Sequence, residues 1–159
     1  MNLRFGRDPL SNPEAQIRRV YAYVAYRLGD GPDAEDVTSE VFERALRYRD
    51  SYDRSKGEPT AWLLGIARRC TSETLAERAE VRAELVEQAD GTNVEEESVR
   101  RIALAAALAQ LGERDQELIA LRFGADLTAA QIARSLELDR KSTRLNSSHV
   151  RLSRMPSSA

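Results

Sequence analysis

A cluster of acidic side chains at the start of one predicted helix raises the question of metal chemistry. Carboxylates on helices hold metal ions when histidines or carboxylates from other helices join them. The sequence has no evident additional metal ligands, because His149 is its only histidine and Cys70 is its only cysteine. We therefore interpret the cluster as a solvated helix face that meets a partner, and we expect no cofactor. Its members are Asp33, Glu35, Asp36 and Glu40.

The small number of histidine and cysteine residues also weakens the hypothesis that the protein is an enzyme. A lone histidine removes most zinc and Ser-His catalytic schemes, and no acid–base or nucleophile constellation is visible. Cys70 lies on an apolar helix face, which favours a small buried hydrophobe over a nucleophile. One cysteine also gives no disulfide framework, so a reducing cytoplasm is the expected compartment.

A polar loop over residues 49–60 has the composition of a single-stranded DNA contact. It carries Tyr52 among the basic residues Arg54 and Lys56, and aromatic and basic side chains together can capture unstacked bases. Arg68 and Arg69 follow on the next predicted helix, where they could meet phosphates. A solvated helix face explains these two arginines equally well from the pattern alone.

Composition and charge narrow the class of protein. Of 159 residues, 42% are hydrophobic, 31% charged and only 6% aromatic, which suits an α-helical protein. No apolar run approaches the length of a membrane span, and no targeting signal opens the chain. The net charge is −2, yet residues 139–159 carry +4, so residues 1–138 carry −6. An acidic body disfavours loose binding to nucleic acid, so any such contact must use local basic patches.

Apolar residues at steps of three and four predict the helices that position these groups. One helix runs from Pro13 to about Leu28. After a break at Gly31 and Pro32, a second runs from Asp33, its expected cap, to about residue 49. A third starts near Pro59 and projects beyond the core. The predicted buried face of the first is Ile17, Val20, Tyr21, Val24 and Leu28, and that of the second is Ala34, Val37, Val41, Ala45 and Tyr48.

A second helical unit follows the break at residues 89–97. One helix stops at Gly112 with an apolar face that includes Ile102. Residues 113–123 form another, whose apolar residues are Leu118, Ile119, Leu121 and Phe123. Thr128 then caps a short helix with Ile132, Ala133 and Leu136 inside, which is typical of the first helix of a helix-turn-helix. We therefore predict an all-α fold of two small helical domains joined by a linker. The boundaries are 1–12 (flexible arm), 13–88 (first domain), 89–97 (linker), 98–138 (second domain) and 139–159 (tail).

The tail has an unusual feature. Residues 139–149 and 153–159 can be encoded by the two ends of a widely used short-read sequencing adapter, with residues 150–152 where its variable index lies. We expect that the natural sequence was cut at about Leu138, that its recognition helix is missing, and that the remaining residues are read-through. The basic residues beyond it, such as Lys141 and Arg144, are then accidental rather than DNA-reading.

Three stretches resemble a bacterial RNA polymerase sigma factor of the extracytoplasmic-function type. They are GDGPDAEDVTSEVFERAL, EPTAWLLGIARR and LAQLGERDQELIALRFGADLTAAQIARSLEL, in that order. The resemblance implies a region-two domain that binds core RNA polymerase and opens the minus-ten element of promoter DNA. It also implies a region-four helix-turn-helix for the minus-thirty-five element, and an anti-sigma factor as a further partner.

The resemblance also assigns roles by position. The expected polymerase-binding residues are Asp33, Asp36, Ser39, Glu40 and Phe42, with Ser39 where glutamine is more usual. The expected DNA-binding residues are Tyr52, Arg54, Lys56, Trp62, Arg68, Arg69, Gln131 and Arg134. Departures at Arg69 and Glu73, where the family often has asparagine and aspartate, bear on minus-ten preference. The alternative hypothesis is a stand-alone helix-turn-helix regulator, which would not bind core polymerase.

Overall fold

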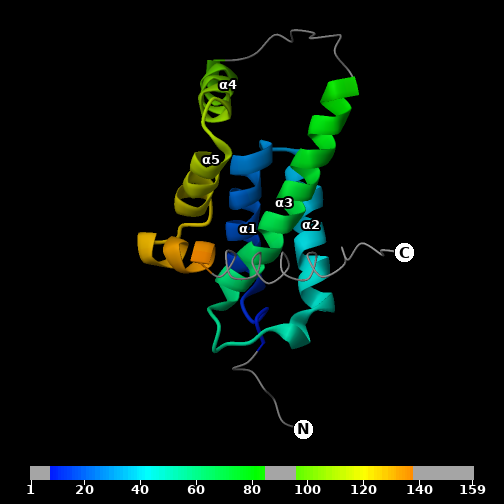
Figure 1. The fold of residues 1–159 in the computed structure, drawn as a ribbon, viewed down its shortest axis with the longest axis vertical. Coiled ribbons are helices and arrows are strands. Elements are labelled where there is room, and N and C mark those ends of the chain that lie inside the picture. The colour runs from blue at the N-terminus through cyan, green and yellow to red at the C-terminus, as the bar shows by residue number, and fades with distance from the viewer. Residues whose placement is uncertain (1–7, 85–95, 138–159) are drawn as a thin grey trace, which may run out of the picture.

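The computed structural model describes residues 8–84 and 96–137, and helices are its only regular secondary structure there (Figure 1). The helices are α1 (Pro13–Leu28), α2 (Pro32–Arg47), α3 (Pro59–Glu84), α4 (Glu96–Ala109) and α5 (Glu113–Ile119). Two short turns, η1 (Arg49–Ser51) and the π-helical η2 (Ala120–Gly124), extend α2 and α5. Residues 129–137 are also helical. The predicted all-α class is confirmed.

The first three helices form a bundle in which α3 crosses α1 and α2 (Figure 1). The predicted inner face of α2 is confirmed at Ala34, Val37, Val41 and Ala45, which are all buried. Cys70 of α3 is buried too, as its apolar surroundings predicted, and burial raises the pKa of its thiol. The bundle therefore has an ordinary apolar centre with a cysteine that behaves as a small hydrophobe.

Several predicted faces and caps of the first two helices are wrong. Ile17 is 45% exposed, while Tyr23 is fully buried in its place, because α1 meets partners on two sides rather than one. Tyr48, at the end of α2, is 54% exposed. Asp33 does not cap α2, because the helix starts at Pro32 with Gly31 as its cap residue. The Asp33 carboxylate instead pairs with Arg78 of α3.

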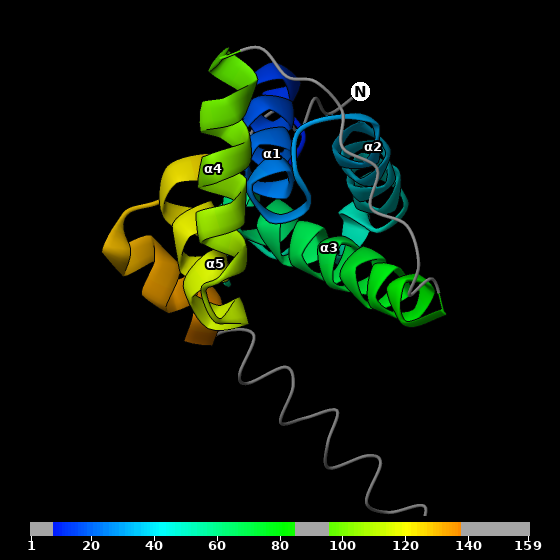
Figure 2. The ribbon, with the colours of Figure 1, turned by 90° about the horizontal axis from the view of Figure 1, so that it is seen from above.

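The second half of the chain packs directly on the first. α5 and η2 lie beside α1 in both views of the ribbon (Figures 1 and 2). Ala120, Leu121, Ala125 and Leu127 are buried in the same apolar cluster as Tyr23 of α1. The two predicted helical units thus share one core.

Other expectations for the second half need correction. Phe123 is 66% exposed and Ala133 is exposed, although Ile132 is buried as predicted. Ile102 of α4 is 55% exposed, because α4 stands above α5 and away from the bundle (Figure 1). Thr128 does cap the last helix, since its Oγ1 accepts from the Gln131 backbone N–H at 3.3 Å and its own N–H donates to the Gln131 side chain at 2.9 Å.

Some predictions fall outside residues 8–84 and 96–137. They are the arm before Asp8, residues 89–95 of the predicted linker, and the tail from Asp139 that is expected to derive from an adapter. Within the described ranges, no helix combines the length and apolar character needed to cross a membrane.

Candidate nucleic-acid interface

The loop between α2 and α3 is held by an aromatic pair. The rings of Tyr52 and Trp62 lie 5.5 Å apart at an angle of 56°, a favourable tilted arrangement. The Tyr52 hydroxyl donates to the Gly57 carbonyl at 2.9 Å, so the ring closes the loop on itself. Partial burial raises the pKa of this hydroxyl, which therefore remains a donor at neutral pH.

The far side of the same loop is ordered by Asp53. Its carboxylate accepts from the Ser55 hydroxyl at 2.7 Å and from the Ser55 N–H at 3.0 Å, and these bonds lower the pKa of Asp53. Such a side-chain-to-backbone turn is typical of aspartate. Lys56 lies 3.8 Å from the same carboxylate and is largely exposed. The loop thus presents a cation on a fixed backbone.

Two adjoining cavities open around this loop. One, of about 330 Å³, is lined by the aromatic pair and by basic side chains of α3; the other, of about 690 Å³, is lined by the loop and by the last helix. Lys56 and Ser135 line both, so the cavities meet. The first contains Tyr52, Lys56, Trp62, Arg68 and Arg69, and the second contains Arg54, Lys56, Gln131 and Arg134.

Every residue expected to bind DNA therefore lines one of the two cavities, although these residues come from both halves of the chain. The aromatic rings supply stacking surfaces, and the guanidinium and ammonium groups can bind phosphates. Arg19 of α1 joins the second cavity. No sequence pattern singles out Arg19, which stands beside Arg18 on the polar side of a predicted helix.

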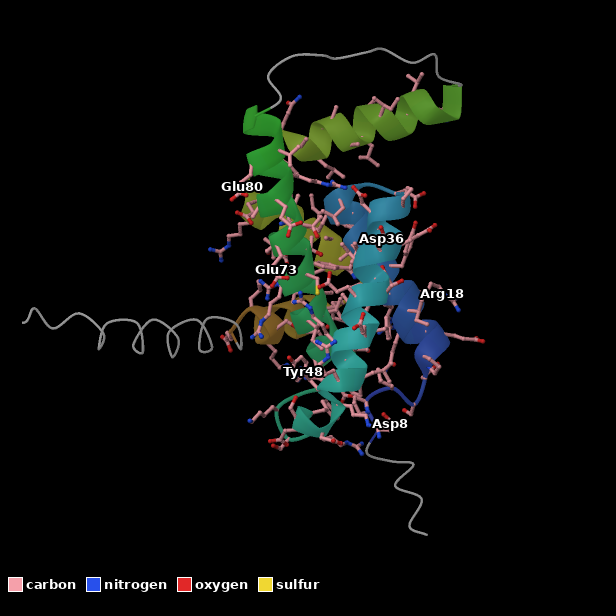
Figure 3. All side chains as sticks on the ribbon, turned by 90° about the vertical axis from the view of Figure 1, so that its right-hand side faces the viewer. Asp8, Arg18, Asp36, Tyr48, Glu73 and Glu80 are labelled. Atoms are coloured by element: carbon pink, nitrogen blue, oxygen red, sulfur yellow. The ribbon has the colours of Figure 1, made fainter. Side chains whose placement is uncertain are left out.

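The residues expected to contact the polymerase follow one another along α2. Figure 3 looks onto this side of the molecule, with Asp36 on the upper part of α2 and Tyr48 at its lower end. Asp36 and Ser39 are exposed, whereas Phe42 is half-buried and packs partly against the core. Phe42 thus contributes to the core and also leaves part of its side chain exposed for contact with a partner.

The remaining polar face of α2 is less free than the sequence suggested. Arg44 donates to Glu73 of α3 at 2.7 Å and to Glu40 at 2.5 Å. The hydrogen bond from Arg44 lowers the pKa of Glu73, and the same bond raises the pKa of Arg44. Glu73, where the family often has aspartate, therefore joins α2 to α3, and Figure 3 shows it on the α3 side facing α2.

A largely buried polar cluster between the two halves was not predicted. The Glu117 carboxylate of α5 lies 2.6 Å from Nε of Arg68 and 3.4 Å from Nε of Arg27, and it accepts from the Tyr23 hydroxyl at 2.9 Å. Burial raises the pKa of Tyr23, and the charge of Glu117 raises it further, so the hydroxyl stays protonated. No local pattern points to this cluster, because its members come from three helices.

Comparison with known proteins gives two family matches in order along the chain. The family model Sigma-70 region 2 matches residues 14–80, and Sigma-70, region 4 matches residues 107–144. The first covers the α1–α3 bundle with the aromatic loop. The second covers α5, the last helix and residues beyond those described.

Two curated proteins are similar over most of the chain. The ECF RNA polymerase sigma factor BldN of Streptomyces coelicolor (strain ATCC BAA-471 / A3(2) / M145) is 35% identical over 123 residues, 72% of this chain and 47% of that protein. The ECF RNA polymerase sigma factor SigK of Mycobacterium ulcerans (strain Agy99) is 31% identical over 127 residues, 74% of this chain and 68% of that protein. The chain thus spans about half the length of the first and two thirds of the second. No solved structure matches significantly.

Proposed function

Because the chain belongs to the ECF RNA polymerase sigma factors, we propose that it binds core RNA polymerase and directs promoter recognition and opening. The proposed action is binding, not covalent catalysis. Its place is the cytoplasm, where bacterial polymerase works, and an anti-sigma factor is a further proposed partner.

The proposed polymerase contact is the exposed face of α2. Asp36 and Ser39 are exposed there, and Asp33 and Glu40 add carboxylates that are 60% and 44% exposed. Charged groups at the rim of an interface guide association and orientation, and the half-buried Phe42 adds an apolar edge. Such a face suits a basic partner surface.

The proposed promoter contact is the pair of cavities around Tyr52. Extruding a base from the duplex costs a few kcal/mol, and stacking on an aromatic side chain returns about 1–3 kcal/mol per base. The Tyr52–Trp62 pair supplies the rings, while Arg54, Lys56 and Arg69 fix the strand through its phosphates. The single observation that carries the proposal is that all eight residues expected to bind DNA line these cavities.

The test is capture of core polymerase followed by promoter-dependent transcription. Wild type is expected to retain core polymerase, and Asp36→Arg is expected to lose at least tenfold in affinity, because it reverses a charge without touching the core. Glu80→Arg is the matched control, an equal charge reversal on the exposed surface of α3, and should bind as wild type does. Equal binding by Asp36→Arg would contradict the assignment of α2. Absence of any polymerase binding, with DNA binding intact, would favour the stand-alone regulator.

A further inference from the structure

An arginine joins the proposed polymerase-binding helix to its neighbour. Arg44 of α2 reaches Glu73 of α3, with its Nη2 2.7 Å from one carboxylate oxygen and its Nη1 3.3 Å from the other. Two-point bonding between a guanidinium and a carboxylate fixes orientation as well as distance. The same Nη2 donates to the Glu40 carboxylate at 2.5 Å. The contact with α3 therefore also orients a side chain of the proposed polymerase contact.

Arg78 of α3 makes a second connection, at the start of α2. Its Nη1 donates to the Leu28 carbonyl at 3.0 Å, and its Nη2 pairs with the Asp33 carboxylate. Leu28 is the last residue of α1, and the helix itself leaves a carbonyl at this place without an N–H donor. One side chain therefore connects the end of α1, the start of α2 and α3.

The short turn before α2 gives little control over the direction of that helix. Residues 29–31 connect α1 to α2, and Gly29 and Gly31 have φ angles of 90° and 138°, which glycine adopts because it has no Cβ. Asp33 and Arg44, where α3 holds α2, lie about 16 Å apart along the helix. Two connections at that separation oppose both tilting and sliding of α2 along α3, which lies beside it (Figures 1 and 3).

We propose that Arg44 and Arg78 are positioning residues for polymerase binding. They hold α2 on α3 in the orientation that presents Asp36 and Ser39, which are exposed between the two connections, to the polymerase. Arg44 acts through Glu73, and Arg78 acts through the ends of α1 and α2, so neither has to touch the polymerase. The inference rests on the proposed function, since it takes the exposed face of α2 as the polymerase contact.

The direction of the effect separates positioning from direct attraction. An acidic face suits a basic partner, so removal of a positive charge beside it should, by charge alone, leave the affinity unchanged or raise it. Positioning predicts the opposite, namely that Arg44→Gln and Arg78→Gln both weaken binding. If the competent orientation of α2 falls from nearly all chains to about one in five, the apparent Kd rises about fivefold.

The main test is a double-mutant cycle on Arg44 and Glu73 in the full chain. Affinity for core RNA polymerase is measured by biolayer interferometry without DNA. Arg44→Gln and Glu73→Gln change the net charge in opposite directions, yet each should raise the Kd about fivefold, because each breaks the same connection. The double variant should bind no more weakly than either single variant, since the connection is already lost in each. Losses that multiply in the double variant would refute a shared role.

Glu43 and Arg47 are the matched control pair. They form an ion pair of the same kind at 2.9 Å, but both belong to α2, so this pair joins no second helix. Glu43→Gln and Arg47→Gln should bind core polymerase as wild type does. An equal loss of affinity in these two variants would show that charge on α2, rather than its connection to α3, controls binding, and would overturn the proposal.

Thermal unfolding at pH 7 separates positioning from a general loss of structure. Arg44 and Glu73 are 30% and 54% exposed, and ion pairs this exposed contribute little to stability, so the Tm of their variants should stay close to that of wild type. Weaker binding by Arg44→Gln, Glu73→Gln and Arg78→Gln at an unchanged Tm supports the proposal. Wild-type affinity in these variants, or a loss of affinity that accompanies a lower Tm, contradicts it.

The wild-type measurement keeps the two proposals apart. If wild type binds core polymerase and the three variants bind equally well, the positioning role is rejected and the proposed function stands. If wild type does not bind core polymerase, the proposed function is rejected, and the positioning role falls with it.

Discussion

Substitutions at Tyr52 can distinguish a role in holding the loop together from a role in stacking on a DNA base. Tyr52→Phe keeps the ring beside Trp62 but removes the hydrogen bond to the Gly57 carbonyl. A single hydrogen bond contributes about 0.5–1.5 kcal/mol. If the whole of this free energy serves to order the loop for DNA binding, its loss lowers the affinity for single-stranded DNA by about twofold to tenfold.

Tyr52→Ala removes the ring as well. Loss of base stacking costs about 1–3 kcal/mol, and loss of the aromatic pair costs about 0.5–1.5 kcal/mol. The expected decrease in affinity is therefore at least tenfold beyond that of Tyr52→Phe. Both variants are compared in complex with core polymerase, by fluorescence anisotropy of a labelled promoter strand.

The control for this comparison is Tyr26→Ala. Tyr26 is an exposed tyrosine on α1, 40% accessible, whereas Tyr52 is partly buried, and Tyr26 lines neither cavity. It should leave the affinity unchanged. If Tyr52→Phe and Tyr52→Ala lose the same affinity, the ring does not stack on a base and Tyr52 acts only by closing the loop, which refutes the stacking assignment.

Further variants test stability and local order. Leu121→Ala deletes a fully buried side chain and should lower the free energy of unfolding by about 2–5 kcal/mol; urea unfolding should remain one transition, and two separate transitions would contradict a shared core. Thr128→Ala removes the cap of the last helix at a cost of about 1 kcal/mol, which should appear as faster hydrogen exchange of amides 131–137 with the bundle unaffected. The pKa of Glu73 is lowered in the folded chain, so its stabilising effect is present above the ordinary glutamate pKa, about 4.3, and is lost as pH falls through the lower folded value. Glu73→Gln should accordingly show a smaller loss of thermal stability between pH 5 and about pH 3 than wild type, and identical acid profiles would argue against the Arg44–Glu73 bond.

Much of the local structure followed from spacing alone. Pro13 and Pro59 begin helices as predicted, because proline lacks the N–H that a first turn leaves unpaired. Pro32 was placed in the break before α2 and instead begins that helix for the same reason. The inner face of α2 was predicted because its apolar residues recur at the helical period, and the Thr128 cap because a hydroxyl can accept from the first turn. The eight residues expected to bind DNA were named from the family resemblance, and the structure places them along two cavities that Arg19 also lines.

Errors arose where a helix meets more than one neighbour. A single apolar stripe was expected on α1, but Tyr23 and Arg27 face the second half of the chain and are buried as well. Phe123 was expected inside from its hydrophobicity, yet it lies on the outer side of η2, since a π-helical turn shifts the register of the residues that follow. The spacing of apolar residues indicates which face of a helix is apolar, but it does not indicate how many neighbouring helices pack against that helix.

The sequence by itself determined the helices, their main breaks and the acidic face of α2, because these depend on neighbours within one or two turns. Only the tertiary structure decided that Glu117 meets Tyr23 across 94 positions of the chain and reaches Arg68 on a third helix. Contacts of that range leave no local signature, since their free energy depends on the burial of groups brought together from separate helices. The acidic face of α2 therefore follows from the helical period of the sequence, whereas the Glu117 cluster follows from how the two halves of the chain pack.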